Sequence, residues 1–441
     1  MHSALNIFRG NLRFANIFLA LLLPVLLFLT FNMHSKLKTN TYHGVIWADA
    51  AGYYAYLPMW FIYGNNSMNW PANIENNTGH GFALDNNTNT IKNKYFSGVA
   101  LLQAPFFLCA HFIQKISNLP TDGFSRTYIN SILIASIFYS WLGLLILFNL
   151  FKKRFSSFHS LLTILLILLA TNLYYYAITA NGMSHAYSFF LFSLLLFLID
   201  KRKNNYSYFL ITGIVCGLII LCRPSNIIFI PAILLFGIKN LNEFKERIFS
   251  FFSTIKSVAI LIIGFSLPLL PQLFYLQKSF GHLISYTYTG ESFSNWMHPR
   301  LFKVWFSTNN GLFTYTPFLL LALAGIVLGI KKNKIENMFI FSAFIIVSLI
   351  CASWWNWWFG CSYGARNFVE YYALFAFPAA DFLFSRRKKL QKIIVWSFAF
   401  LCIVININML YYYDGCFYGG EWDWNSYLKL SHYLIIQQPL Q

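Results

Sequence analysis

The chain has 441 residues, of which 57% are hydrophobic, 20% aromatic and only 10% charged. Soluble chains carry about a quarter charged residues, so this composition excludes an ordinary water-soluble protein. A mean hydropathy of +0.53, together with repeated apolar runs, predicts an all-α polytopic membrane protein. We expect one integral membrane domain over residues 1–441.

Eleven apolar stretches are predicted to be membrane-spanning helices. They are Phe14–Asn32, Thr127–Phe151, Phe158–Ile178, Ser184–Ile199, Tyr206–Cys222, Asn226–Ile238, Ser257–Leu276, Leu312–Ile330, Asn337–Ser353, Phe368–Phe384 and Ile393–Tyr413. The first has no small-residue cleavage site after it, so we expect a retained signal-anchor. The short stretch from Asn226 follows Arg223 and Pro224, which predicts a broken helix.

The distribution of charge predicts the topology. The net charge is +18, from 32 basic and 14 acidic residues. Eleven spans place 20 basic and 5 acidic residues on one side, and 12 basic and 9 acidic residues on the other. The side rich in Lys and Arg is expected to be cytoplasmic, which puts the amino terminus there and the carboxyl terminus outside. The excess of basic residues is then explained without binding to nucleic acid.

The longest outer segment, residues 34–126, follows the first span, and loops of this length are usually functional. It contains an aromatic stretch at 50–63, an asparagine-rich part and an apolar stretch at 97–113. We predict two interfacial helices with a wet loop between them, because a crossing at 97–113 would put the later basic loops outside. Residues 414–441 form an outer tail. Cys361 and Cys416 lie outside under this topology, and either a disulfide or two free thiols fits the sequence.

Asp49 is the main candidate for a catalytic group. It lies after the first span among apolar and aromatic neighbours, where desolvation is expected to bring its pKa closer to that of a working base. Tyr53 and Tyr54, from the same stretch, are candidate substrate contacts. The alternative is an exposed loop aspartate or a helix cap for the following residues.

Arg223, Arg366 and Glu370 form a second group of candidates. An arginine fork is suited to a phosphate, and Lys94 and Arg126 are weaker candidates for the same role. Glu370 follows Arg366 by four residues, so the alternative is an intrahelical salt bridge. Glycines 360 and 364, before Arg366, would let a substrate approach the backbone. His185 is a further candidate substrate contact, although a structural histidine fits equally.

Eleven of the thirteen tryptophans are predicted to lie at the outer face, whereas an ordinary aromatic belt would populate both interfaces. Some are headgroup anchors, and the rest indicate flat platforms on which sugar rings stack. The densest group of candidate substrate contacts is Trp354, Trp355, Asn356 and Trp357. The sequence has no CxxC pair, no HExxH and no P-loop, so neither a zinc nor a nucleotide motif is present.

The segment Asp49-Ala50-Ala51-Gly52-Tyr53-Tyr54-Ala55-Tyr56-Leu57-Pro58, followed by Lys94-Tyr95-Phe96-Ser97-Gly98 and Pro105, resembles the GT-C superfamily of polytopic glycosyltransferases. The region from Trp354-Trp355 to Gly364-Ala365-Arg366, ending in Pro378, looks like the W-W-x-G-x-x-x-G-x-R pattern of bacterial family 39 or Rgt-like members. Arg223-Pro224-Ser225-Asn226 is similar to their R-P-[ST]-N turn.

The resemblance implies a bacterial inner-membrane enzyme that transfers a sugar, with inversion, from a polyprenyl-phosphate-linked donor to a periplasmic lipid, glycan or protein acceptor. It implies that Asp49 is the general base. Ala50 and Ala51 stand where many members carry a second acid, so no cofactor or metal is expected. Two alternatives remain: a transporter or flippase, and a ligase of lipid-linked saccharides. No second copy of the long first loop appears, and that loop comes early in the chain, so both fit less well.

Overall fold

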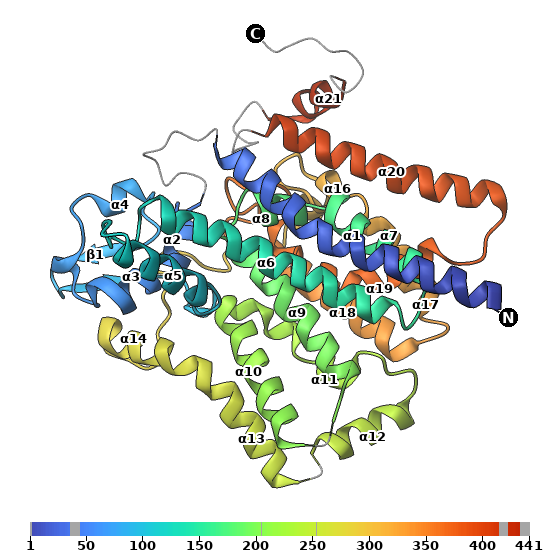
Figure 1. The fold of residues 1–441 in the computed structure, drawn as a ribbon, viewed down its shortest axis with the longest axis horizontal. Helices are drawn as coiled ribbons and strands as arrows, with labels where there is room; N and C mark the ends of the chain where they lie inside the picture. The colour runs from blue at the N-terminus through green and yellow to red at the C-terminus, as the bar shows by residue number, and fades with distance from the viewer. Residues whose placement is uncertain (1, 36–44, 204, 253, 414–421, 433–441) are drawn as a thin grey trace.

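The computed structural model describes residues 2–35, 45–203, 205–252, 254–413 and 422–432. The described chain is mostly helical (Figure 1). Three of its longest helices, α1 (His2–Ser35), α6 (Arg126–Phe151) and α20 (Lys389–Tyr412), run in similar directions along the long axis of the molecule (Figure 1). This direction is that of the expected membrane normal.

The other helices between α6 and the carboxyl terminus are mostly shorter. They are α7 (Ser157–Leu169), α8 (Leu173–Ile178), α9 (Ser184–Asp200), α10 (Tyr206–Cys222), η3 (Pro224–Phe229), α11 (Ala232–Leu235), α12 (Leu241–Phe251), α13 (Ile255–Ser266), η4 (Leu267–Leu269), α14 (Leu270–Phe280), α15 (Leu301–Phe306), α16 (Leu312–Tyr315), α17 (Leu319–Gly329), α18 (Lys334–Ser353), η5 (Arg366–Phe368), α19 (Tyr372–Leu383) and α21 (Trp424–His432).

Every predicted span coincides with a helix or with two or three consecutive helices. Among the described residues, six helical stretches are long and apolar enough to cross a membrane, and five of them coincide with predicted spans. The sixth is α5 (Gly98–Ile116), which we predicted to lie along the interface. Length and composition therefore support a multi-pass membrane protein, and the number of eleven spans stays a prediction.

Several predicted spans are broken helices. Asn226–Ile238 divides into η3 and α11, as Arg223 and Pro224 predicted, because Pro224 occupies the first turn of η3. The stretch at 158–178, predicted as one span, divides into α7 and α8. At this break Asn172 donates to the carbonyl of Tyr363 (2.9 Å) and accepts from the hydroxyl of Tyr372 (2.5 Å). The break thus holds the segment that leads to Arg366.

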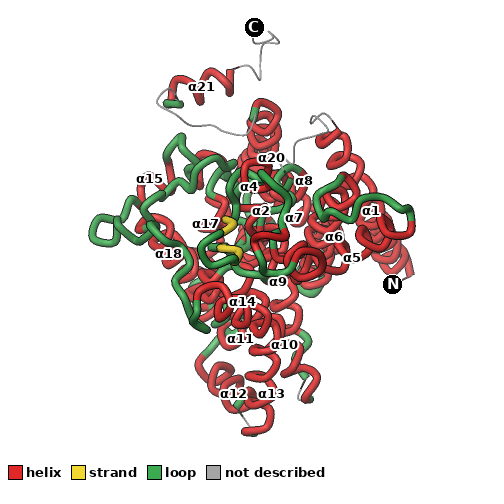
Figure 2. The backbone as a smooth tube through the Cα atoms, turned by 90° about the vertical axis from the view of Figure 1, so that its left-hand side faces the viewer, coloured by secondary structure: helices red, strands yellow, loops and turns green. Residues whose placement is uncertain are grey.

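The first loop is more ordered than predicted. Its aromatic stretch forms α2 (Asp49–Tyr54), α3 (Tyr56–Pro58) and the π-helix η1 (Met59–Tyr63). The asparagine-rich part contains η2 (Ser67–Asn69), α4 (Ile74–Asn77) and a hairpin of β1 (Ala83–Asp85) and β2 (Thr90–Lys92). Asp85 turns this hairpin by accepting from the backbone of Asn87 and Thr88. Figure 2 shows the hairpin and many loops at this end of the molecule.

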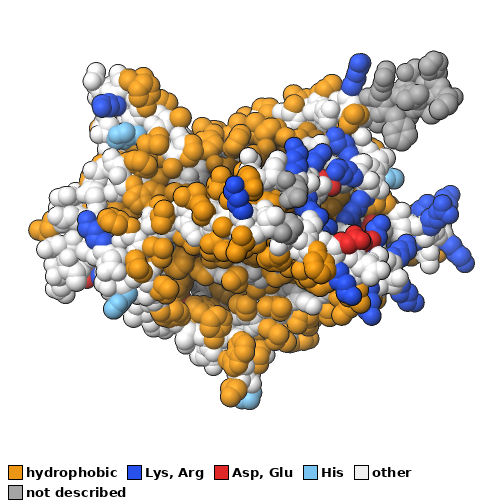
Figure 3. Space-filling view, turned by 90° about the horizontal axis from the view of Figure 1, so that it is seen from below, with side chains coloured by type: hydrophobic (Ala, Val, Ile, Leu, Met, Phe, Trp, Pro, Cys, Tyr) orange, Lys and Arg blue, Asp and Glu red, His pale blue; other side chains and the backbone are white. Residues whose placement is uncertain are grey.

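Apolar and basic side chains occupy different parts of the surface along the long axis. Apolar side chains cover the middle of the face shown in Figure 3, and Lys and Arg gather toward the end at which α1 begins. The first-loop elements lie at the opposite end (Figure 1). This separation of charge agrees with the predicted topology, whose orientation in a membrane stays a prediction.

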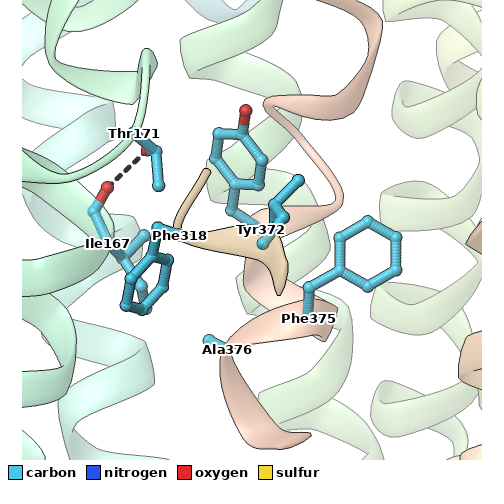
Figure 4. A pocket seen from close by; sticks show the side chains of 7 residues that line it. Ile167, Thr171, Phe318, Tyr372, Phe375 and Ala376 are labelled. Atoms are coloured by element: carbon cyan, nitrogen blue, oxygen red, sulfur yellow. Dashed lines mark hydrogen bonds between the residues drawn. The ribbon is translucent and has the colours of Figure 1, made fainter. Parts of the chain in front are cut away.

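The helix core contains a small gap. This gap, between α7, α17 and α19, is lined by Ile167, Thr171, Phe318, Leu319, Tyr372, Phe375 and Ala376 (Figure 4). The hydroxyl of Thr171 donates to the carbonyl of Ile167 there, at 2.5 Å. None of the candidate site residues from the sequence lines this gap.

Candidate active site

Asp49 is placed by a strained turn at the start of α2. Ala48 has a positive φ of 48°, which is unusual for a residue with a side chain. Gly81 supports this turn, because a Cβ atom there would lie 2.0 Å from the carbonyl oxygen of Ala48. Ala48 is the N-cap residue of this helix, and Asp49 is the first residue inside it. The helix-cap alternative for Asp49 is therefore wrong.

The Asp49 carboxylate is held on both oxygens. Its Oδ2 atom lies 2.8 Å from the Nη2 atom of Arg366, and its Oδ1 atom accepts a hydrogen bond from the hydroxyl of Tyr95. The side chains of Asp49 and Arg366 are 28% and 15% exposed, so the ion pair is only partly screened by solvent. The structure thus joins the two main candidates from the sequence, which come from distant parts of the chain.

The expected direction of the Asp49 pKa is wrong. Burial does raise the pKa of this carboxyl, but the charge of Arg366, the hydrogen bond from Tyr95 and the charge of Lys94 outweigh it and bring the pKa below its usual value. Asp49 is therefore ionised at neutral pH. In turn, Asp49 raises the pKa of Arg366 against the effect of burial.

Arg366 and Glu370 do not pair with each other in this arrangement. Arg366 begins the short 3-10 helix η5, which ends at Phe368, so Glu370 lies beyond that helix. Glu370 pairs with Arg223 and His185 instead, so the intrahelical salt bridge is wrong. Arg366 turns to Asp49, and its guanidinium lies 5.8 Å from the centre of the Phe359 ring. At Gly364 the room for a side chain is filled by Tyr315 and Asn172, so this glycine serves packing.

Glu370 belongs to a second buried polar group. Its Oε1 atom accepts from Nη1 of Arg223 at 3.1 Å, and its Oε2 atom lies 3.0 Å from Nδ1 of His185. Arg223 also lies 3.3 Å from His185 and donates to the side chain of Asn367. Glu370 and His185 are each 1% exposed. The three predicted residues Arg223, His185 and Glu370 are thus brought together from three different helical segments.

Tyr53 packs against the first group and interacts electrostatically with both. Its ring packs on that of Tyr95, with the ring centres 4.7 Å apart. The charges of Arg223, Asp49 and Arg366 all act on its phenol. The two groups are therefore neighbours and form one site.

Lys94 borders this site and is engaged by an acid. Its ammonium pairs with Glu291, which lies in the segment between α14 and α15. The Glu291 carboxylate also accepts a hydrogen bond from the indole of Trp355, at 3.3 Å. The same ammonium lies 5.3 Å and 5.5 Å from the ring centres of Tyr95 and Tyr288. Tyr288 in turn contacts Trp354 edge to face. Glu291, Tyr288 and Tyr95 were missed from the sequence.

The remaining predicted residues lie elsewhere or serve the core. Tyr54 is buried against Phe107 and Phe124, and Trp357 is 9% exposed. Trp355, by contrast, is 48% exposed. The Oδ1 atom of Asn356 is buried without a hydrogen-bond partner among the described residues. Arg126 begins α6, is exposed, and acts electrostatically on His34.

The structure describes only one of the two cysteines in the predicted pair. Cys361 is disulfide-bonded. Cys416 lies outside the described residues.

Residues 93–269 match the family model described as dolichyl-phosphate-mannose-protein mannosyltransferase. The match includes Lys94, His185 and Arg223, and it leaves out Asp49 and Arg366. No curated protein sequence matches the chain. This match confirms the resemblance to GT-C membrane glycosyltransferases.

Among solved structures, the chain is similar to the archaeal oligosaccharyltransferase AglB from Archaeoglobus fulgidus, solved with an inhibitory peptide and a dolichol-phosphate. The two are 12% identical, with a TM-score of 0.47. The alignment covers 97% of this chain and 60% of the oligosaccharyltransferase, so this chain spans less than two thirds of that protein.

Proposed function

We propose that the protein is an inverting glycosyltransferase that moves a sugar from a polyprenyl-phosphate-linked donor to a periplasmic lipid, glycan or protein acceptor. The observation that carries the proposal is the Asp49 carboxylate, ionised and held on both oxygens beside the guanidinium of Arg366. The match of residues 93–269 to a lipid-phosphate-sugar-dependent family supports the same chemistry.

Each part of the site has a role in this transfer. The leaving polyprenyl phosphate carries negative charge as the glycosidic bond breaks, and fixed cations stabilise it. Arg366 and Arg223 supply this charge, and Lys94 supplies more once it exchanges Glu291 for the phosphate. Asp49 takes the proton of the acceptor hydroxyl as the new bond forms. Because no second acid accompanies Asp49 in the sequence, we propose that no metal takes part.

The environment of Asp49 suits this cycle. Arg366 keeps the pKa of Asp49 low. A phosphate that draws the guanidinium away would weaken that effect and make the carboxylate a stronger base. Donor binding would thereby prepare the base for the acceptor. Trp355, the most exposed ring of the tryptophan group, offers a face for a sugar.

The test is a comparison of cell-envelope glycans, by liquid chromatography and mass spectrometry, between cells with and without the protein. We expect one sugar to be missing without it, with its lipid-linked donor accumulating on the outer leaflet. Accumulation of the donor on the inner leaflet would instead identify a flippase. An unchanged set of glycans and lipid-linked sugars would contradict the proposed transfer.

A further inference from the structure

We propose that Tyr95 is a positioning residue that fixes the orientation of the Asp49 carboxylate, and that Gly52 is the residue that makes this placement possible. The inference rests on the proposed function, because it assigns to Asp49 a part in sugar transfer. Tyr95 itself acts through Asp49 and needs no contact with the substrate.

Gly52 lies inside α2, three residues after Asp49, and the ring of Tyr95 occupies the room beside it. A Cβ atom on Gly52 would lie 2.1 Å from Cδ2 of Tyr95 and 2.6 Å from the carbonyl oxygen of Gly81. Both distances are far below ordinary contact. Any larger residue at position 52 must therefore push the Tyr95 ring away from the helix that carries Asp49.

The backbone of Tyr95 is held to the same helical stretch. The side chain of Asn93 donates to the carbonyl of Gly52 at 2.6 Å and accepts from the amide of Tyr95 at 3.0 Å. The hydroxyl of Tyr56 donates to the carbonyl of Tyr95 at 2.7 Å. Ring and backbone thus dock Tyr95 on the segment 49–56, and its hydroxyl reaches Oδ1 of Asp49.

This hydroxyl decides how the carboxylate is presented. Arg366 binds only Oδ2, so without Tyr95 the carboxylate is free to rotate about its last bond. With Tyr95 in place, two partners from different segments fix its plane. The phenol stays a donor, because burial and the neighbouring Asp49 charge raise the pKa of Tyr95 well above its usual value.

Loss of the hydroxyl has a predictable direction. A donor to the charged form lowers the pKa of a carboxyl, so Tyr95→Phe raises the pKa of Asp49 and moves the acid limb of the rate profile to higher pH. The charged and titratable groups that act on Asp49, or on which it acts, are Arg366, Lys94, Tyr53, Tyr95 and Tyr288. The four others are kept in the Tyr95→Phe variant.

The experiment measures kcat and KM against pH for the purified chain in nanodiscs, with a synthetic polyprenyl-phosphate sugar as donor. The variants are Tyr95→Phe, Gly52→Ala and the double variant of Tyr95→Phe with Asp49→Asn. Tyr63→Phe is the matched control, because its hydroxyl donates to the carbonyl of Asp122, in the same loop. Melting temperatures are recorded for all variants at each pH.

We expect Tyr95→Phe to lower kcat about 10-fold or more, as the loss of one hydrogen bond to a charged group predicts, with little change in donor KM. Gly52→Ala should do the same, both should move the acid limb to higher pH, and Tyr95→Phe should add nothing to Asp49→Asn. A Tyr95→Phe enzyme with wild-type kcat and an unmoved acid limb would overturn the inference, as would additive effects in the double variant.

The measurements distinguish a failure of the proposed sugar transfer from a failure of the proposed role of Tyr95. If the wild type transfers no sugar from any lipid-linked donor, the proposed function fails, and the inference is then judged on the melting temperatures alone. These should show coupling between Tyr95→Phe and Asp49→Asn that weakens as Asp49 is protonated at low pH. Additive melting shifts at every pH would overturn the positioning of Asp49 by Tyr95.

Discussion

Replacing Arg366 by lysine removes the geometry of the ion pair and keeps its charge. The guanidinium donates to Asp49 at 2.8 Å and lies over the ring of Phe359, and only 15% of the side chain is exposed. Lysine retains a point charge but lacks the planar fork. A hydrogen bond between charged groups contributes about 1.5–3 kcal/mol, so loss of the bond that Arg366 is proposed to make to the leaving phosphate should lower transfer roughly 10- to 150-fold.

Lysine is a better choice than a neutral residue for this test. Removing one partner of a buried pair strands the other charge and costs roughly 3–5 kcal/mol, which would confuse loss of activity with loss of fold. The assay is transfer by purified Arg366→Lys in nanodiscs, with its melting temperature measured in parallel. Arg300→Lys, at an exposed arginine before α15, is the matched control. Wild-type transfer by Arg366→Lys would refute the assignment of Arg366.

Two further predictions concern the neighbours of this pair. Glu291→Gln frees Lys94 for the donor phosphate and should lower the donor KM with little change in kcat. The expected change in KM is about two- to fivefold, because the Lys94–Glu291 pair is partly exposed. Glu243→Gln is the control, and an unchanged donor KM in Glu291→Gln would contradict the role of Lys94. Because the folded pKa of Asp49 is depressed, its stabilisation is present above the unfolded pKa of about 3.9 and is lost as pH falls through the folded value. The melting temperature of Asp49→Asn should therefore lie below that of the wild type at pH 7, and this difference should shrink below about pH 4; a constant difference would contradict the pairing.

The sequence predicts the helical elements well because they are apolar and long. The stretches at 127–151 and 337–353 are recovered as α6 and α18, with boundaries within a few residues. The breaks were harder to predict. Pro224 marks one break, whereas the break before Leu173 depends on hydrogen bonds that Asn172 makes to residues far along the chain. No local pattern carries that information.

The sequence also predicts most of the charged residues in the site, and it misses their pairing. Asp49 stands alone in an apolar segment, so the sequence finds it. Its partner is Arg366, whereas Glu370 pairs with Arg223 and His185, which lie far away in the sequence. Pairings over such distances leave no local pattern in the sequence. Tyr95 was missed although Gly52 carried a signal, since a glycine inside a helix indicates close approach of another group.

The most direct test of the account is sugar transfer by Asp49→Asn, which is nearly isosteric and keeps hydrogen-bonding ability. A positioned general base contributes roughly a hundred- to ten-thousand-fold, so the account predicts a loss of about that size, with donor binding little changed. Asp200→Asn is the control. Asp200 is the last residue of α9, and its carboxylate pairs with Lys153, which lies between α6 and α7. Donor binding, transfer rate and melting temperature are measured on the same nanodisc preparations. Transfer at the wild-type rate by folded Asp49→Asn would contradict the central claim.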